Sequence, residues 1–283
     1  MKRGQFWAVA PLVTPAMTIL VLFFGTLSVM IAYSFLPSTG MGQVGEGFTL
    51  ENYQKFLGNA FYLSYVSRSL VLSLYCTAIT LVLGYLVAYV MYRASPTACL
   101  IIGLILVVQF FTAYVIRTYA IMLILGRNGA VNKLLLNLRL VDEPLQLIFN
   151  ELGVAIGMVL VSIPFMALPI YSSLHVIPRD LESAAHSLGA TPFKCFWTII
   201  LPLSLPGIAA GIIIVYLFQI TAYIIPGLLG GGYFDMVANL IYNKAMGAMD
   251  YPLSASASVT MLVISSTIVY AAQKLFAWLG PRT

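Results

Sequence analysis

Arg117 is the residue whose type and setting stand out most, because it lies inside the long apolar run 98–125. If this run crosses a membrane, a charge within it costs about 3 kcal/mol unless it is paired or hydrated. Arg117 is therefore expected to face the interior of a helix bundle or a water-filled path, with Tyr114 and Thr118 beside it in the same run. Two interpretations remain open: a structural clamp on the carbonyls of a broken helix, and a contact with a solute.

A second polar group lies in the apolar run 205–229. Tyr216, Gln219 and Tyr223 are separated by three and seven residues, which places them on one face of a helix. Such a stripe either packs against a neighbouring helix or lines a solute path, and the sequence favours neither. The candidate solute path consists of Arg117, Tyr114, Thr118, Tyr216, Gln219 and Tyr223.

Residues for catalysis or metal binding do not occur in a recognisable pattern. The three cysteines are scattered, and the two histidines, His175 and His186, have no carboxylate partner at the spacing of metal ligands. The sequence shows no Ser-His-Asp order, no glycine-rich phosphate loop and no paired carboxylates within an apolar run. We therefore predict no catalytic residues, no metal site and no cofactor.

Composition places the chain in a membrane. Of its 283 residues, 61% are hydrophobic and only 8% are charged, and the mean hydropathy is +0.97. No soluble fold buries so much apolar surface, so the sequence predicts an all-α, multi-pass membrane protein. The net charge of +5 comes from basic residues scattered singly among apolar runs, which argues against nucleic-acid binding.

Six apolar runs are long enough to be transmembrane helices. Residues 1–68 are expected to hold the first span and a long outside loop, residues 69–275 the other five spans, and residues 276–283 a short cytoplasmic tail. The expected spans are approximately 6–35, 69–91, 98–125, 146–174, 205–229 and 253–275.

The stretch 178–202 is a polar segment between two of these spans. Asp180 is expected to cap a helix that ends at Gly189, which supplies a left-handed stop. Thr191 is expected to cap a second helix, with Pro192 at its first position. The segment is thus predicted to form a helix–turn–helix hairpin; the alternative is an amphipathic helix on the membrane surface.

This segment resembles the cytoplasmic coupling loop of the permeases of bacterial ABC importers, whose pattern is Glu-Ala-Ala, a glycine, and Ile-x-Leu-Pro. The Glu-Ala-Ala position is occupied by Ser183, Ala184 and Ala185, with a carboxylate, Glu182, one residue earlier. The resemblance implies that the segment binds an ATPase. The implied coupling residues are Asp180, Glu182, Ser183, Ala184, Ala185, Gly189, Ile199, Leu201 and Pro202.

The resemblance extends to the spermidine/putrescine branch of type I importer permeases. It is carried by the sequence RTYA at 117–120, by IPFMALPIYSSL at 163–174, and by the region from IPGLLGGGYFDM to DYPLSASASV. It implies the MetI-like fold with six spans, a second and different permease, two cytoplasmic ABC ATPases and a periplasmic solute-binding protein. The implied mechanism is alternating access, in which the ATPases move the hairpin and the hairpin reorients the spans.

The distribution of basic residues favours an orientation in the bacterial inner membrane with both termini in the cytoplasm. The inside loops and tails are then short, which is where the positive-inside rule applies best. The basic residues on the cytoplasmic side would be Lys2, Arg3, Arg93, Arg179, Lys194, Lys274 and Arg282.

The solute is expected to be a polyamine or a related small amine. No Asp or Glu lies within the expected fifth span, but the 17 tyrosines offer aromatic faces to a cation. An opine, an amino-acid conjugate or a phosphonate remains an alternative, since Arg117 suits an anionic group. A carrier that works without ATP is the alternative of a different class, and only Arg117 resembles the ionisable residues that such carriers place in their spans.

Overall fold

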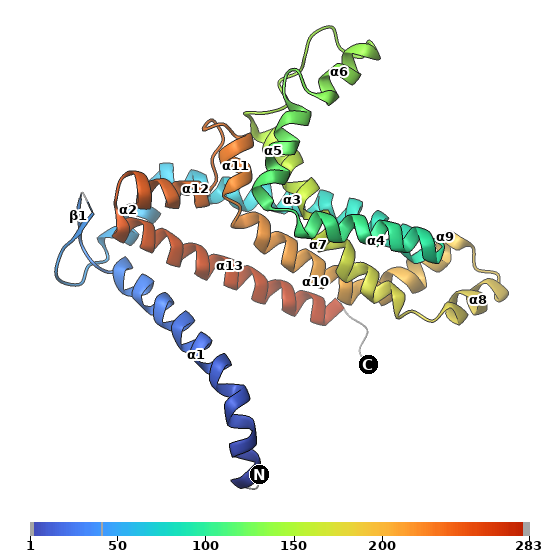
Figure 1. The fold of residues 1–283 in the computed structure, drawn as a ribbon, viewed down its shortest axis with the longest axis horizontal. Helices are drawn as coiled ribbons and strands as arrows, with labels where there is room; N and C mark the ends of the chain where they lie inside the picture. Colours follow the sequence, from blue (N-terminus) through green and yellow to red (C-terminus); the bar gives the residue numbers. More distant parts are fainter. Residues whose placement is uncertain (1–2, 41, 280–283) are drawn as a thin grey trace. The chain divides into compact units, whose positions relative to one another are not determined.

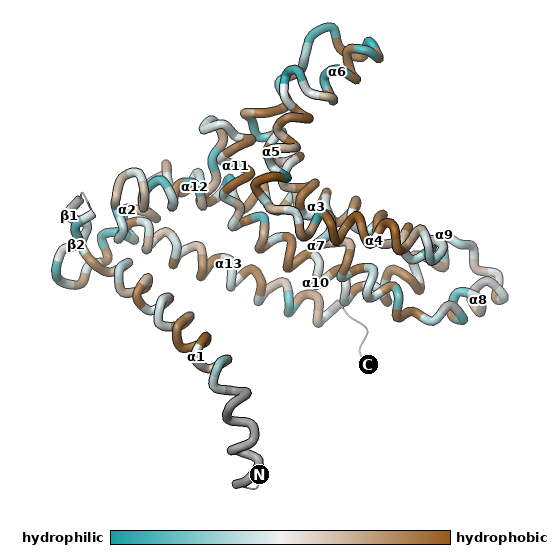
Figure 2. Tube along the Cα trace, viewed as in Figure 1, coloured by the Kyte–Doolittle hydropathy of each residue, from teal (hydrophilic) through white to brown (hydrophobic). Residues whose placement is uncertain are grey.

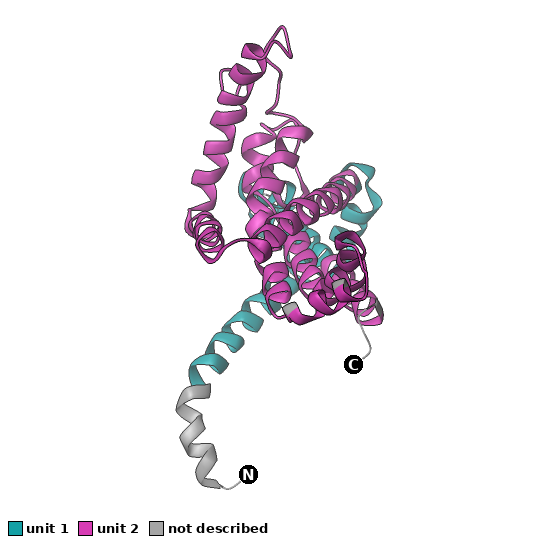
Figure 3. Cartoon of the chain, turned by 90° about the vertical axis from the view of Figure 1, so that its right-hand side faces the viewer, with its two compact units in different colours: residues 1–63, 240–263 teal, residues 64–239, 264–283 magenta. Residues whose placement is uncertain are grey.

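The computed structural model describes the backbone of residues 3–40 and 42–279, and the side chains of residues 14–39, 42–178, 180–185 and 187–278. Lys2, Arg282 and the last part of the expected tail lie outside these residues. The chain divides into two compact units, each of which joins two separate stretches of sequence (Figure 3). Unit 1 comprises residues 1–63 and 240–263, and unit 2 comprises residues 64–239 and 264–283.

Unit 1 begins with the long helix α1, Arg3–Ser34, whose described apolar side chains are largely exposed. A short antiparallel hairpin of β1, Ser38–Gly40, and β2, Gln43–Val44, leads to helix α2, Glu51–Gly58. The end of α1 is bound to α2, because the Asn52 amide donates to the carbonyls of Ser34 and Leu36 at 3.2 and 2.8 Å. The expected long loop after the first span is therefore an ordered structure.

The sequence FTLENYQKFLG predicts a short interfacial helix with Phe48, Tyr53 and Phe56 facing lipid. Phe48 precedes α2 in the structure, and for Phe56 the prediction is wrong. Phe48 is 74% exposed, but Phe56 is fully buried and stacks on Tyr62 with the ring centroids 5.6 Å apart. Tyr53 bonds to the hydroxyl of Ser34 at 2.7 Å. The short helix uses its aromatic residues to pack within unit 1.

Unit 2 contains most of the helices (Figure 1). Two further helices, α12 (Val237–Tyr242) and α13 (Tyr251–Leu279), include residues of both units. A π-helical turn, Asn243–Gly247, follows α12. The helices of unit 2 are α3 Ala60–Arg93, whose first residues belong to unit 1, α4 Pro96–Phe111, α5 Tyr114–Leu125, α6 Ala130–Asn137, α7 Glu151–His175, α8 Arg179–Ser187, α9 Pro192–Cys195, α10 Leu201–Ile220 and α11 Ile224–Leu229.

Five of the described helices are long and apolar enough to cross a membrane, and a sixth span is present if the bent pair of α4 with α5 and α6 counts as one. The third span was expected to be a continuous helix, and this is wrong. The chain is extended at Thr112 and Ala113, where it turns by 106°. No proline or glycine lies at this break. Figure 2 shows apolar residues along α4 and hydrophilic residues around α8.

Helices α7 and α10 pack side by side and form the centre of unit 2. Gly207 on α10 allows this approach, because a Cβ atom there would lie 2.5 Å from the carbonyl oxygen of Pro169 on α7. Pro164 and Pro169 lie inside α7 and do not end it, although proline usually interrupts a helix. Small residues at close helix contacts are the usual means of packing spans in lipid.

The buried residues of unit 2 form two main clusters along α7. One cluster joins the first half of α7, with Val154 and Met158, to Ile225 and Leu229 of α11. The other joins its second half to α10 and to the segment 178–202, and it includes Met166, Ile170, Leu174, Ala185, Cys195 and Ile200. The polar segment is therefore packed against the transmembrane helices.

Candidate functional site

The segment 178–202 folds largely as its sequence predicts. Gly189 follows α8 with a φ of +81°, and the hydroxyl of Thr191 accepts a hydrogen bond from the Lys194 amide at 3.3 Å. Both capping predictions are confirmed. Asp180 was expected to precede the helix, but α8 begins at Arg179, so its carboxylate lies within the first turn and there still interacts favourably with the helix dipole.

The second arm of this segment is not a separate helix. From Pro192 the chain continues through α9 and a π-helical turn, Phe196–Ile200, directly into α10. Pro202 lies in the first turn of α10, where proline is tolerated. The fifth span therefore begins earlier than residue 205, because this arm is continuous with α10.

The predicted coupling residues divide between an outer and an inner face. Asp180, Ser183 and Ala184 are exposed, and so is Gly189. Neighbouring apolar side chains extend this outer face, since Leu181, Leu188 and Phe193 are 43%, 89% and 73% exposed. The residues that are buried or half-buried against the rest of unit 2 are Glu182, Ala185, Ile199, Leu201 and Pro202.

Glu182 is the residue whose placement the sequence does not reveal. It is only 6% exposed. One carboxylate oxygen, Oε2, lies 2.6 Å from Nη2 of Arg93, and the other, Oε1, accepts a hydrogen bond from the hydroxyl of Tyr92 at 2.6 Å. Sequence patterns do not identify Arg93 or Tyr92 as partners of this segment. The signal that could have identified Arg93 is its position, as a lone cation in the short turn after an apolar run.

The breaks in two spans meet at a cavity of about 540 Å³. One break separates α4 from α5 at Thr112 and Ala113, and the other separates α10 from α11 at residues 221–223. Broken helices expose backbone groups that need partners, and in transporters they often form solute sites. The cavity is lined by Phe110, Phe111, Thr112, Ala113, Tyr114, Arg117, Phe165, Phe218, Thr221, Ala222, Tyr223 and Ile224.

Arg117 contributes the positive charge of this cavity. Its guanidinium carbon lies 5.8 Å from the ring centroid of Tyr114. Its Nε and Nη1 atoms are buried, and no atom of the described residues accepts a hydrogen bond from them. The structural clamp suggested by the sequence would require such acceptors, so the contacts favour an acceptor from outside the described residues.

Three of the six residues proposed for the solute path line the cavity, namely Arg117, Tyr114 and Tyr223. The other three do not. Thr118 is buried and donates to the carbonyl of Tyr114 at 2.9 Å. Because α10 ends at Ile220, Tyr223 does not continue the helical stripe of Tyr216 and Gln219.

Gln219 is the centre of a buried polar network between helices. Its Oε1 accepts a hydrogen bond from Thr77 on α3 at 3.0 Å, and its Nε2 contacts the hydroxyls of Ser162 at 3.2 Å and Thr80 at 3.4 Å. Tyr216 is also buried. These contacts support the packing interpretation of the two residues on α10.

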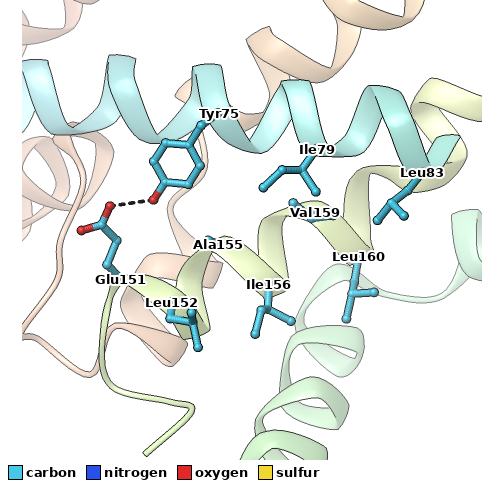
Figure 4. A pocket seen from close by; sticks show the side chains of 9 residues that line it. All are labelled: Tyr75, Ile79, Leu83, Glu151, Leu152, Ala155, Ile156, Val159 and Leu160. Atoms are coloured by element: carbon cyan, nitrogen blue, oxygen red, sulfur yellow. Dashed lines mark hydrogen bonds between the residues drawn. The ribbon is translucent and has the colours of Figure 1, made fainter. Parts of the chain in front are cut away.

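A second cleft, of about 600 Å³, lies between α3 and α7 (Figure 4). Its polar group is a hydrogen bond of 2.6 Å from the hydroxyl of Tyr75 to Glu151, and the other lining side chains are aliphatic. Among the residues whose side chains are described, no group of three or more His, Cys, Asp or Glu could hold a metal ion.

Comparison with known proteins identifies the family of this chain. Residues 80–283 match the family described as binding-protein-dependent transport system inner membrane component. The chain is 32% identical to the spermidine/putrescine transport system permease protein PotB of Haemophilus influenzae over 241 residues, which cover 85% of this chain and 84% of that protein. It is 33% identical to PotB of Escherichia coli over 253 residues, which cover 89% and 90%.

A similar fold occurs in a solved structure. A chain of a bacterial ABC transporter involved in the import of the acidic polysaccharide alginate superposes with a TM-score of 0.75. The superposition covers 97% of this chain and 96% of that chain, at 15% identity. At this identity the likeness concerns the fold, and it confirms the predicted fold of importer permeases.

Proposed function

Because the chain belongs to the family of binding-protein-dependent inner-membrane transport components, we propose that it is the permease subunit of an ATP-binding-cassette importer of polyamines such as spermidine and putrescine. The observation that carries the proposed solute is the 32–33% identity to the PotB permeases over most of both chains. The chain is a multi-pass membrane protein, and in this family it is a transport component and not an enzyme. ATP hydrolysis is assigned to separate subunits.

The outer face of α8 supports a contact with an ATPase. Leu181, Ala184 and Leu188 lie on one side of α8 and its end, at a spacing of three and seven residues, and all three are exposed. An exposed apolar strip on a helix fits a hydrophobic groove of a partner. We assign this strip to a contact with the ATPase. Because Ser183 stands where the motif has a glutamate, the contact surface carries no charge at position 183.

The mechanism follows from the connections of this segment. The chain runs from α7 into α8 and from α9 without interruption into α10, so a displacement of α8 acts on two spans that are packed together. ATP binding would move the ATPases, α8 would follow, and α7 and α10 would tilt as a pair. Alternating access of the cavity at the helix breaks is the consequence.

The proposed assembly contains a second, different permease, two cytoplasmic ATPases and a periplasmic solute-binding protein. The cavity at the helix breaks offers aromatic faces for a polyamine, from Tyr114, Tyr223, Phe165 and others, but none of its lining residues is acidic. Carboxylates for a polycation are therefore assigned to the partner permease. Both termini are placed in the cytoplasm, and the contact of Arg93 with Glu182 supports this, because it sets two predicted cytoplasmic turns together.

Arg117 favours a second candidate solute. Two of its nitrogens are buried and have no acceptor among the described side chains and backbone, and a carboxylate or phosphonate would supply one. The second candidate is thus an importer of the same architecture for an opine, an amino-acid conjugate or a phosphonate. A polyamine would need an acidic residue of the partner permease beside Arg117 to neutralise it.

The experiment is to reconstitute the complete complex in vesicles with its binding protein and to measure ATP hydrolysis and uptake with each solute class. Stimulation by spermidine or putrescine is the expected result. Stimulation only by an anionic or zwitterionic solute would replace the polyamine by the second candidate. Uptake by this chain in the absence of any ATPase would contradict the importer and support a carrier that works without ATP.

A further inference from the structure

The last turns of α3 carry three tyrosines on one face. Tyr85, Tyr89 and Tyr92 follow a spacing of four and seven residues, and we refer to them as the tyrosine ladder. Successive ring centroids are 6.5 and 6.4 Å apart. Arg93 extends the ladder, since its guanidinium carbon lies 5.4 Å from the ring centroid of Tyr89 and 5.5 Å from that of Tyr92. The end of α3 thus presents one continuous aromatic and cationic surface.

Both arms of the segment 178–202 contact this surface. On the first arm, Glu182 of α8 binds Arg93 and Tyr92 through its two carboxylate oxygens. On the second arm, Phe196 packs edge-on against the first two rings of the ladder, with centroid distances of 5.7 and 5.5 Å. A third contact follows on α10, where the hydroxyl of Ser204 lies 3.3 Å from that of Tyr85.

The contact with Glu182 determines how α8 is held. A helix of nine residues is too short to be stable alone, and α8 is joined to its neighbours by short turns at each end. The Glu182 side chain is 8% exposed, while that of Arg93 is 47% exposed. A buried carboxylate with both oxygens bound fixes the rotation of α8 about its axis, because a turn in either direction would leave the charge without a partner.

The same geometry removes Glu182 from the surface that a partner can reach. Ser183 and Ala184, which follow it, are exposed, whereas Glu182 and Ala185 face α3 and the buried cluster around α7. Moving the carboxylate one position back from the usual site of the motif rotates it by about 100° around a helix. That rotation is enough to exchange an outward contact for an inward one.

We propose that Arg93 and Tyr92 fasten the coupling segment to α3 through Glu182, so that α8 moves α3 together with α7 and α10. Arg93, Tyr92 and Glu182 are positioning residues, and Glu182 acts within this chain and not on the ATPase. The inference rests on the proposed function, because it requires that α8 transmits the movement of an ATPase. The inference adds α3 to the two spans, α7 and α10, that move with α8. The contact of Glu182 with Arg93 and Tyr92 is what connects α3 to α8.

The test uses the complete reconstituted complex with its loaded binding protein and measures solute transported per ATP hydrolysed. Glu182→Gln and Arg93→Gln each break the ion pair without a large change of shape. We expect each variant to lower this ratio by roughly fivefold or more. Fivefold is the lower end of the effects that energetic coupling between two sites of a protein usually produces. The exchanged pair Arg93→Glu with Glu182→Arg should recover at least part of the ratio, which a merely destabilised subunit would not do.

A matched control is Glu143→Gln, which removes an exposed carboxylate from the loop between α6 and α7. It should leave the ratio unchanged. If the two single variants fail to assemble, Tyr92→Phe provides a milder change that removes one hydrogen bond to the same carboxylate. We expect it to lower the ratio by about twofold to fivefold.

Three outcomes distinguish the possibilities. Assembled Glu182→Gln and Arg93→Gln complexes that keep the wild-type ratio would overturn the inference. Failure of Glu182→Gln alone to bind the ATPase, with Arg93→Gln unaffected, would also overturn it, because Glu182 would then contact the ATPase directly. A wild-type complex whose ATP hydrolysis does not respond to any loaded binding protein would instead contradict the proposed function.

Discussion

Arg93 and Arg117 show two opposite ways in which unit 2 places an arginine within or at the end of an apolar helix. Arg93, at the end of α3, pairs with a buried carboxylate at 2.6 Å and lies over two tyrosine rings. Arg117, in the first turn of α5, lies near one tyrosine ring and has two buried nitrogens without an acceptor among the described residues. A partnered charge holds elements together, whereas an unpartnered one is available to a ligand.

The surroundings of the two arginines also differ, because Arg93 lies in a closely packed region and Arg117 lies beside a cavity. Around Arg93, α8 and the π-helical turn before α10 are packed into a continuous buried cluster with α3 and α7. Around Arg117, the two broken spans leave a cavity of about 540 Å³. In the proposed mechanism the first region transmits a displacement, because it is closely packed, and the second binds the solute, because it contains a cavity. The comparison predicts that equivalent substitutions in the two regions have different effects.

The largest effect is expected for Arg93→Ala. This change leaves the buried carboxylate of Glu182 with Tyr92 as its remaining partner, so the free energy of unfolding should fall by about 2 kcal/mol. The value is lower than for a fully buried pair because Arg93 is half-exposed. Equilibrium unfolding in mixed detergent micelles measures it. An unchanged free energy of unfolding would mean that the ion pair does not form in solution.

A smaller loss is expected for Gln219→Leu, which tests the polar network between α3, α7 and α10. The hydroxyls of Thr77 and Ser162 would lose their partner, and we expect a decrease of about 1.5 kcal/mol in the free energy of unfolding. Gln109→Leu is the matched control, because Gln109 makes one exposed hydrogen bond to the carbonyl of Leu160. Equal losses for both variants would show that the network has no special role.

Gly189→Ala tests the turn after α8. Alanine at a φ of +81° should cost about 1 kcal/mol, although nothing lies within 4 Å of the added Cβ atom. Gly58→Ala is the control, since its added Cβ atom also meets open space but its φ is not positive. Thermal unfolding of the purified subunit measures the difference. If both variants lower the unfolding temperature equally, Gly189 does not adopt the left-handed conformation in the purified subunit.

The smallest effect on stability, and of opposite sign, is expected for Arg117→Met. Replacing an unpartnered buried charge by an apolar side chain of similar length should leave the free energy of unfolding unchanged or raise it by about 1 kcal/mol. The solute preference should change at the same time, which uptake assays detect. Arg117→Lys, which keeps the charge, is the control. A loss as large as that of Arg93→Ala would show that Arg117 is partnered and would remove the contrast.

Features that depend on neighbouring residues could be predicted well. Apolar runs of sufficient length give the spans, because the bilayer requires internally bonded helices. The stop at Gly189 and the cap at Thr191 follow from the conformational freedom of glycine and from a side chain that bonds three residues ahead.

Features that depend on residues far apart in the sequence could not be predicted. Gln219 meets its partners 139 and 142 residues away on α3, and Tyr92 meets Glu182 90 residues away. The break at Thr112 and Ala113 has no local signal, and it separates Tyr114 and Arg117 from the helix on which the sequence places them.

The sequence by itself thus determined that this chain crosses a membrane and carries a polar segment with defined turns, since these properties follow from local hydropathy and backbone chemistry. Only the tertiary structure decided which charges are paired. A carboxylate such as Glu182 turns inward or outward according to what lies opposite it. Arg117 has no acceptor for two of its nitrogens within the described part of the chain, because it lies where two broken spans leave a cavity.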